Sequence, residues 1–401
     1  MSRSRILVTE CVAILITTVV VVGCEREDPG AVGGTDVATY TFEAEARVDG
    51  YAADLVPIGW LGPSPSDVIA VVQIQARKVR LFDSLGVDVG SVGQQGEGPG
   101  EFMRPVQAGW LGDDLWVNDV QLDRVTVFSP GLEVVRTIRV PSIAVPRSED
   151  REQLPDFPFV TPYALYDDDA MFVSSQVASG DERAERLGIS SAYLRINATG
   201  EIQNLVISMA PERSSVSEVL PNGGFIGAVV PFFPSRVRAV APNGALVGLL
   251  TTEVTGPDGG SFRVHVIDGD GSEVFERAFP FEGDPIPQGV VDSVILARSS
   301  GIPDPAVGAR LMEQARSLIP AVYPPVEGFF LGTDGRVWIG LRAAPEGNPW
   351  MVLSPRGELV ATAMAPAGSS LRAASDRRVW AVEQDEFDVE SIVQYRIERI
   401  D

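Results

Sequence analysis

The sequence has very little of several residue types that common functional sites require. Its 401 residues contain one histidine and two cysteines. Sites built mainly from histidine, whether for metal binding or for catalysis, are therefore nearly excluded. Positive charge is also scarce, because 32 lysine and arginine residues stand against 55 acidic ones and leave a net charge of −23. Such a chain repels a phosphate backbone, so no nucleic-acid partner is expected.

A long hydrophobic segment is also missing. The uncharged run near the N-terminus covers only residues 11–22, whereas a membrane-spanning helix needs roughly 20 apolar residues. This run follows Arg3 and Arg5, an order that is typical of a secretory signal peptide. It ends in Val21-Val22-Gly23-Cys24, which resembles a bacterial lipobox.

The lipobox resemblance implies a signal peptide over residues 1–23, cut before Cys24, with Cys24 then acylated. The alternative is an ordinary signal peptide in which Cys24 is merely a small residue. Residues 24–38 are charged and rich in glycine, which predicts a flexible tether. Glu25 is not the aspartate that marks inner-membrane retention. The resemblance therefore implies attachment to the bacterial cell envelope, at the outer membrane, with the membrane itself as a partner.

From Thr39 onward, short alternating strands are separated by turn residues, which predicts an all-β fold. A polar turn followed by an apolar and often Trp-bearing strand occurs six times, at 66–69, 113–116, 168–171, 243–246, 334–338 and 376–380. An alternating strand followed by a tight glycine turn occurs five times, at 79–86, 125–131, 193–200, 264–271 and 350–357. A sixth such strand, 392–397, has no turn or partner after it.

A six-bladed β-propeller over residues 39–401 accounts for the missing strand. Each blade has four strands, and the last blade would take its outer strand from Thr39–Val48. This N-terminal strand would close the last blade and cover an exposed edge. Charged substitutions at Phe42 or Ala44 are then expected to destabilise the domain.

One stretch carries a family resemblance. Residues 93–102, with Pro105, 115–119 and 124–131, resemble an NHL repeat, and the chain is similar to six-bladed propeller lipoproteins of bacterial envelopes. The resemblance covers one blade strongly and implies a propeller fold with a binding role. Asp119 and Arg124 flank a hairpin in this pattern, and we expect them to hold its loop together rather than to catalyse a reaction.

The long connections of the predicted propeller all map to one face, the top face, which carries the connections between blades and those between the second and third strands of each blade. These connections are 141–158, 177–189, 208–236, 253–261 and 280–325. Since loops on a rigid scaffold carry function, the top face is the expected binding face.

One connection contains a helical insertion, at about 285–324. Asp304-Pro305 supplies an N-cap acid and a proline at the first helical position, Val307, Leu311, Ala315 and Leu318 form a stripe, and Pro320 ends the helix. A shorter helix is expected before it. This pair would either cap the axial channel or pack over the rim of the fourth and fifth blades.

Polar side chains at the predicted axial funnel of the top face are the candidate ligand-binding residues. They are Arg104, Asn118, Asp119, Tyr163, Gln176, Arg236, Arg342 and Glu383. The arginines would attract a carboxylate or an anionic glycan, unless neighbouring acids pair with them. His265 is interpreted as a structural histidine. Asp167, Asp168 and Asp169 are expected turn residues, with a calcium site as the alternative.

Two functions are compatible with the sequence. The first is a non-catalytic binding or scaffold module that holds a peptide, glycan or protein partner and needs no cofactor. The second is a metal-dependent enzyme of the lactonase or lyase kind, with a divalent cation such as calcium at the axial funnel. Asn118, Asp119 and Glu383 would contribute ligands to that ion. The absence of a nucleophile-elbow or His–Glu metal motif favours the binding module.

Overall fold

The computed structural model describes residues 37–400 apart from 56, 179, 221–222 and 344–346, and the chain divides into the units Met1–Ala31 and Val32–Asp401. The expected signal segment, Cys24 and the tether up to residue 36 lie outside the described residues. Among the described residues, no helix has the length and apolar character needed to cross a membrane.

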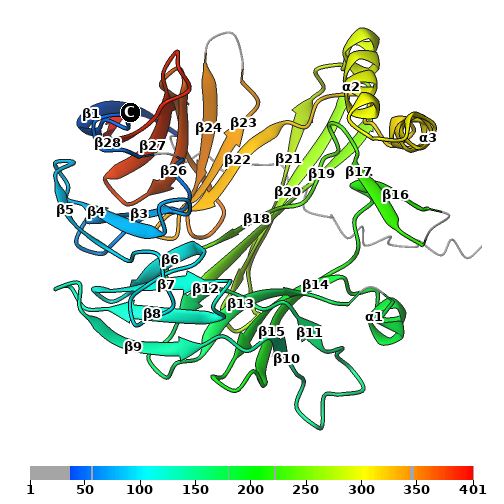
Figure 1. Cartoon of the computed structure of the whole chain (residues 1–401). Coiled ribbons are helices and arrows are strands. Elements are labelled where there is room, and N and C mark those ends of the chain that lie inside the picture. The colour runs from blue at the N-terminus through cyan, green and yellow to red at the C-terminus, as the bar shows by residue number, and fades with distance from the viewer. Residues whose placement is uncertain (1–36, 56, 179, 221–222, 344–346, 401) are drawn as a thin grey trace, which may run out of the picture. The chain divides into compact units, whose positions relative to one another are not determined.

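The second unit consists mainly of antiparallel sheets (Figure 1). Four of them have four strands each, in chain order. The first contains β2 (Leu61–Pro63), β3 (Ile69–Gln73), β4 (Lys78–Phe82) and β5 (Asp88–Val92). The second contains β6 (Pro105–Leu111), β7 (Asp114–Asp119), β8 (Arg124–Phe128) and β9 (Val134–Arg139). The third contains β12 (Thr161–Leu165), β13 (Met171–Gln176), β14 (Ser191–Ile196) and β15 (Ile202–Met209). The fourth contains β18 (Val237–Val240), β19 (Leu246–Gly256), β20 (Gly259–Asp268) and β21 (Glu273–Glu282).

The remaining large sheet has eight strands and two halves. One half is β22 (Val326–Leu331), β23 (Val337–Leu341), β24 (Asn348–Leu353) and β25 (Leu359–Ala365). The other half is β26 (Ser369–Ala374), β27 (Arg378–Gln384), β28 (Glu390–Ile400) and β1 (Ala38–Val48). The structure thus differs from the expectation of six separate blades, because β1 pairs with a strand of each half.

The N-terminal strand β1 joins the two ends of the domain. It pairs antiparallel with β28 from Thr39↔Ile400 to Val48↔Ile392, which confirms the expected partnership between the first strand and the last. It also pairs in parallel with β25, over Ala38↔Ala361 to Tyr40↔Ala363. Tyr40 and Ala38 are buried, whereas Ala44 is exposed. A charge at Ala44 is therefore not expected to destabilise the domain, in contrast to the sequence prediction.

The six polar turns predicted from the sequence lie directly before or at the start of the second strands β3, β7, β13, β19, β23 and β27. Apolar cores lie between successive sheets, and three fully buried tryptophans from these strands, Trp116, Trp338 and Trp380, contribute to them. The core around Trp380 joins β27 and β28 to β3 in the first sheet, so the succession of cores returns to where it began. The arrangement is therefore propeller-like.

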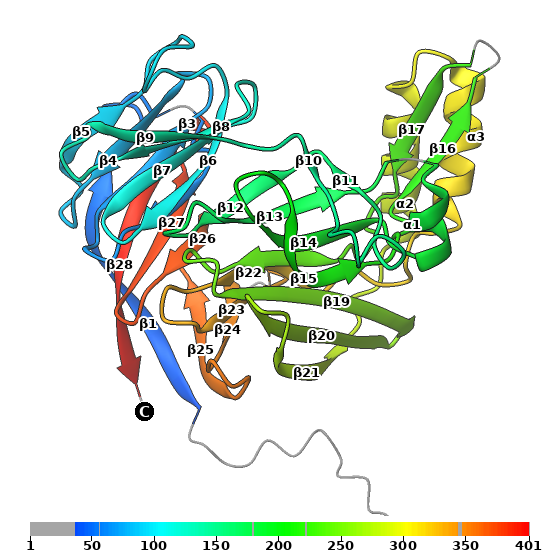
Figure 2. The ribbon, with the colours of Figure 1, turned by 90° about the horizontal axis from the view of Figure 1, so that it is seen from below.

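Within the part of the chain that the structure describes, the insertions contain three helices and two small antiparallel strand pairs. They are α1 (Glu182–Leu187), α2 (Gln288–Ser300), α3 (Pro305–Arg316), the pair β10 (Ile143–Ala144) and β11 (Phe157–Pro158), and the pair β16 (Ser215–Val219) and β17 (Phe225–Val229). Figure 2 shows α2 and α3 beside β16 and β17. The segment 253–261 differs from the prediction: it is mostly strand, because β19 and β20 extend to a turn at residues 257–258.

The helical insertion has its own small core. Asp304 caps α3 by accepting hydrogen bonds from the backbone N–H groups of Ala306 and Val307, as its sequence predicted. Leu311 and Ala315 are fully buried against Val216 of the β16–β17 hairpin. The helices therefore pack on another insertion, and neither of the two predicted placements describes them. Their predicted lengths were also inexact, since α2 is slightly longer than α3 and α3 ends at Arg316.

Candidate functional site

The Gly-rich loop of the NHL-like stretch is held by two charged side chains at the ends of β7 and β8. The Asp119 carboxylate is fully buried and accepts four backbone N–H bonds, from Met103 and Arg104 at Oδ2 and from Gln121 and Leu122 at Oδ1. Such a saturated carboxylate has no lone pair directed at a ligand. The geometry assigns Asp119 to the loop and away from catalysis.

Arg124 holds the other side of the same loop. Its guanidinium donates to the carbonyl oxygens of Glu97, Gly98 and Glu101, at 2.7–2.8 Å. Hydrogen bonds from Gln94 and from the Gly98 N–H hold the pKa of Glu101 below its usual range, so that this carboxylate closes the loop as an anion. Gly96, with φ of +156°, could not carry a Cβ without meeting the Glu101 carboxylate 2.0 Å away.

A small cavity of about 100 Å³ lies where the innermost strands meet. It is lined by residues in or beside β2, β6, β12, β18, β22 and β26, namely Trp60, Leu61, Gly62, Pro63, Gln107, Ala108, Tyr163, Val240, Ala241, Pro242, Phe330, Leu331, Arg372 and Ala373. No carboxylate and no imidazole is present among these described lining residues. The donor set required by an axial calcium or zinc ion is thus lacking there.

Tyr163, a candidate from the sequence, lines this axial cavity, and its ring meets that of Tyr193 edge-on at 5.7 Å. Burial and the neighbouring Tyr163 hold the pKa of the Tyr193 hydroxyl well above its usual range. The Tyr193 phenol therefore remains a neutral hydrogen-bonding group at physiological pH.

The other ligands suggested for an axial metal are elsewhere. The Glu383 carboxylate accepts hydrogen bonds from Arg47 and Tyr395. Asn118 is buried on β7, and its Nδ2 has no hydrogen-bond partner among the described residues. Neither residue lines the axial cavity. None of Asn118, Asp119 and Glu383, the ligands suggested for the metal-dependent alternative, lines the axial cavity.

The remaining candidates do not form one funnel either. Arg104 is exposed beside the Gly-rich loop, and Gln176 is exposed at the end of β13. Arg236 donates through its backbone N–H to Glu212. The acids of the 167–169 turn do not converge on a cation site, because Asp168 lies 3.7 Å from Arg195 and Asp169 lies 3.0 Å from Arg136. Arg342, one of the predicted arginines, lines a large cavity.

Arg342 lies in a groove of about 740 Å³ between the fourth sheet and the half-sheet that begins with β22. Aromatic, proline and other apolar side chains provide most of its lining. The lining residues are Phe262, Phe279, Pro280, Phe281, Glu282, Asp284, Tyr323, Pro325, Leu341, Arg342, Ala343, Pro349 and Met351. We refer to this set as the aromatic groove.

The walls of the aromatic groove are fixed by their own contacts. The Arg342 guanidinium lies 3.8 Å from the centre of the Tyr323 ring, and the Phe232 ring makes an edge-on contact with Tyr323 at 5.3 Å. Phe279 stacks on the buried Phe262 at 5.3 Å. These contacts restrict the rings before any ligand arrives, which reduces the entropy that binding must remove.

The charge of the aromatic groove is negative overall. Arg342 Nε lies 3.3 Å from the Asp284 carboxylate, and Nη1 lies 3.6 Å from that of Glu327. Two carboxylates of the groove, those of Glu282 and Asp284, and that of the adjoining Glu327 stand against one guanidinium. Arg342 is therefore paired with acids, which was the alternative to an anion-binding role.

Sequence reasoning missed most of this groove. Three of its four aromatic residues come from the two ends of the helical insertion, Phe279-Pro280-Phe281 before it and Tyr323-Pro324-Pro325 after it. A dense run of aromatic residues and proline at an insertion boundary was the available signal. The sequence did not predict that the two runs lie in one groove, because their proximity depends on how the intervening helices pack.

Comparisons with known proteins give only distant similarity. No protein-family model matches the chain, and no curated protein matches it in sequence. Among solved structures, a DUF4221 family member from Bacteroides vulgatus is 10% identical, with a TM-score of 0.49, over 90% of this chain and 99% of its own. A Bacteroides fragilis protein described as exported is 9% identical, with a TM-score of 0.47, over 92% and 98%.

A third similar structure is the PQQ-bound aldose sugar dehydrogenase of Streptomyces coelicolor. It is 12% identical, with a TM-score of 0.40, over 90% of this chain and 99% of its own. These TM-scores are all below 0.5.

Proposed function

We propose that this protein is a non-catalytic binding module of the bacterial cell envelope. Its ligand is a polypeptide segment that carries large apolar side chains next to basic ones. The observation that carries the proposal is the aromatic groove, in which Phe279, Phe281 and Tyr323 are half-buried beside a net negative rim.

The lining chemistry favours a polypeptide over a glycan. A glycan needs many directional hydrogen bonds to its hydroxyl groups, whereas the lining of this groove offers mainly rings, prolines and methylene groups. Partly exposed aromatic side chains are the usual anchors of protein–protein contacts. The acids Glu282, Asp284 and Glu327 complement basic side chains in the ligand.

The groove lies beside two of the insertions, which is where a binding face formed by insertions would lie. Phe279, Phe281 and Tyr323 of the groove flank the insertion that contains α2 and α3, and the Tyr323 ring contacts Phe232 of the neighbouring insertion. The β-sheets beneath provide a rigid support. We further propose that acylated Cys24 attaches the protein to the outer membrane through a tether, which would hold the groove close to envelope partners.

We also propose that the eight-stranded sheet counts as two blades, so that the propeller has six. The parallel pairing of β1 with β25 covers only three residue pairs. An apolar core containing Trp338 and Val379 lies between the two halves, as between other neighbouring sheets. Both β22 and β26 contribute to the axial cavity, which is the position of an innermost strand.

The binding proposal is tested with a defined probe. We expect a short fluorescein-labelled peptide of Leu, Phe and Pro flanked by Lys to bind the full chain, and Phe281→Ala to weaken that binding by about tenfold or more. The measurement is fluorescence anisotropy. Phe225→Ala is the matched control, because Phe225 is 73% exposed on β17, away from the groove.

Two further probes give the outcomes that would contradict this proposal. A peptide flanked by Glu is expected to bind at least about tenfold more weakly than the Lys-flanked one, since it meets like charge. A chito-oligosaccharide is expected not to compete. Equal binding of both peptides, equal loss in both alanine variants, or displacement by the oligosaccharide would each reject the proposed ligand class.

A further inference from the structure

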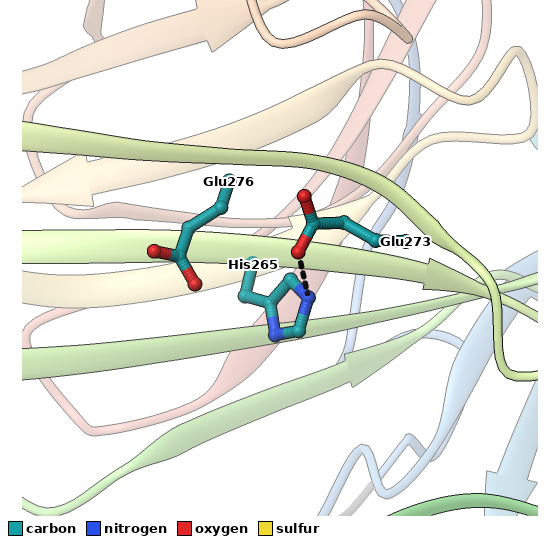
Figure 3. A group of neighbouring side chains, drawn as sticks. All are labelled: His265, Glu273 and Glu276. Atoms are coloured by element: carbon teal, nitrogen blue, oxygen red, sulfur yellow. Dashed lines mark ion pairs between the residues drawn. The ribbon is translucent and has the colours of Figure 1, made fainter. Parts of the chain in front are cut away.

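The only histidine of the chain lies beside two glutamates on the outer hairpin of the fourth sheet (Figure 3). His265 on β20 is directly opposite Glu276 on β21, and its Nε2 lies 3.2 Å from Oε2 of Glu273. One ligand atom of each of the three residues lies within 4.8 Å of the other two. The sequence interpretation of His265 as structural did not anticipate this grouping.

The backbone explains how both glutamates reach the same imidazole. Residues three apart on a regular strand point to opposite faces. Here Val266 pairs with Phe275 but Ile267 pairs with Glu273, so Val274 is an extra residue on β21. This bulge shifts the alternation by one position, which turns Glu273 to the side on which His265 and Glu276 lie.

The same bulge recurs in four other outer hairpins and supplies an internal comparison. The equivalent sets of three residues are Arg80, Asp88 and Ser91; Thr126, Val134 and Thr137; Leu194, Ile202 and Leu205; and Met351, Leu359 and Thr362. In the first of these, Arg80 and Asp88 form an ion pair, which supports the proximity of the first two positions. Of these five hairpins, only that of the fourth sheet has an imidazole and two carboxylates at the three equivalent positions.

The Nε2 atom is the informative part of this cluster. It is shielded from solvent and makes no hydrogen bond of good geometry to any described residue, although Glu273 is close. One imidazole and two neighbouring carboxylates are a metal-ligand set, because one nitrogen and two oxygens leave one position of a tetrahedral ion open. A water molecule would fill that position, since 61% of the Glu273 side chain is exposed.

We propose that His265, Glu273 and Glu276 form a binding site for a divalent transition-metal ion of the zinc class. Ligand atoms bound to one such ion lie about 3.4 Å apart, so small rotations of the two glutamates complete the site. The ion must compete with Arg263, which pairs with Glu276 from the same strand as His265. This site is independent of the aromatic groove and of the proposed peptide ligand.

The single histidine makes the test specific. The full chain labelled with ¹³C at histidine Cε1 gives one resonance, from His265. We expect added Zn²⁺ to shift this resonance with a stoichiometry of about one ion per chain. Zinc bound at other groups, such as the cysteines, does not contribute to this signal, because the label reports on His265 alone. Glu273→Gln and Glu276→Gln are each expected to raise the dissociation constant at this resonance by about tenfold or more.

The matched control is Glu282→Gln, on the same strand six residues beyond Glu276 and so about 20 Å away. It is expected to leave the zinc titration unchanged. All three variants should keep the metal-free thermal unfolding temperature, because each altered side chain is exposed at least in part. The proposal is overturned if excess Zn²⁺ leaves the His265 resonance in place. It is also overturned if the resonance shifts equally in the wild type and in both cluster variants.

Discussion

Asp119→Ala is expected to lower the free energy of unfolding by about 3–5 kcal/mol. The substitution removes the acceptor of four backbone N–H groups in and beside the Gly-rich loop. Each buried donor left without a partner costs about 1–3 kcal/mol, reduced where water can enter. Urea denaturation of the full chain, followed by tryptophan fluorescence, measures the loss.

Asp113→Ala is the control for this experiment, because Asp113 is exposed in the turn just before β7. It is expected to change stability by no more than about 0.5 kcal/mol. An Asp119→Ala protein as stable as the wild type would show that the carboxylate does not hold the loop, and would return Asp119 to the set of candidate ligand residues.

Tyr40→Ala is expected to destabilise the domain by about 3–5 kcal/mol, the usual cost of deleting a large buried aromatic side chain. Tyr40 belongs to the strand that joins the beginning of the domain to its end. It is 7% exposed, and its ring centre lies 6.2 Å from that of Trp338 in the core between the two halves of the eight-stranded sheet. The same urea titration measures this loss.

A charge on the same strand provides the comparison for Tyr40. Ala44→Asp places its carboxylate in solvent and is expected to be nearly neutral for stability. If Tyr40→Ala unfolded at the wild-type urea concentration, β1 would contribute little to closure of the domain, and the count of six blades would lose its support.

Local sequence patterns predicted the strands because their causes are local. Asp334-Gly335 forms a turn in which Gly335 has a φ of +78°, and the strand that follows buries Trp338. The N-cap of α3 at Asp304 likewise depends on residues within one turn of the helix. The missing outer strand was predictable because the repeat count left one position without a strand.

The binding site was much less predictable, since it depends on contacts between distant residues. Phe281 and Tyr323 line one groove although a helical insertion separates them in sequence. The helices of that insertion pack in a core of their own, so the two ends of the insertion lie close together. Arg342 was predicted as a ligand residue, but Asp284, which is 58 positions away, pairs with it. The outer bulge that aims Glu273 at His265 is a property of strand register, which alternating hydrophobicity does not reveal.

The central claim is that the aromatic groove holds the ligand, and photo-crosslinking tests it most directly. The Lys-flanked peptide, with a benzophenone at its central position, is irradiated on the full chain, and mass spectrometry identifies the modified residues. We predict modification at Phe279–Phe281, Tyr323 or Met351, and its loss in Phe281→Ala but not in Phe225→Ala. Modification confined to the axial cavity or to the surface of α2 and α3 would contradict the account.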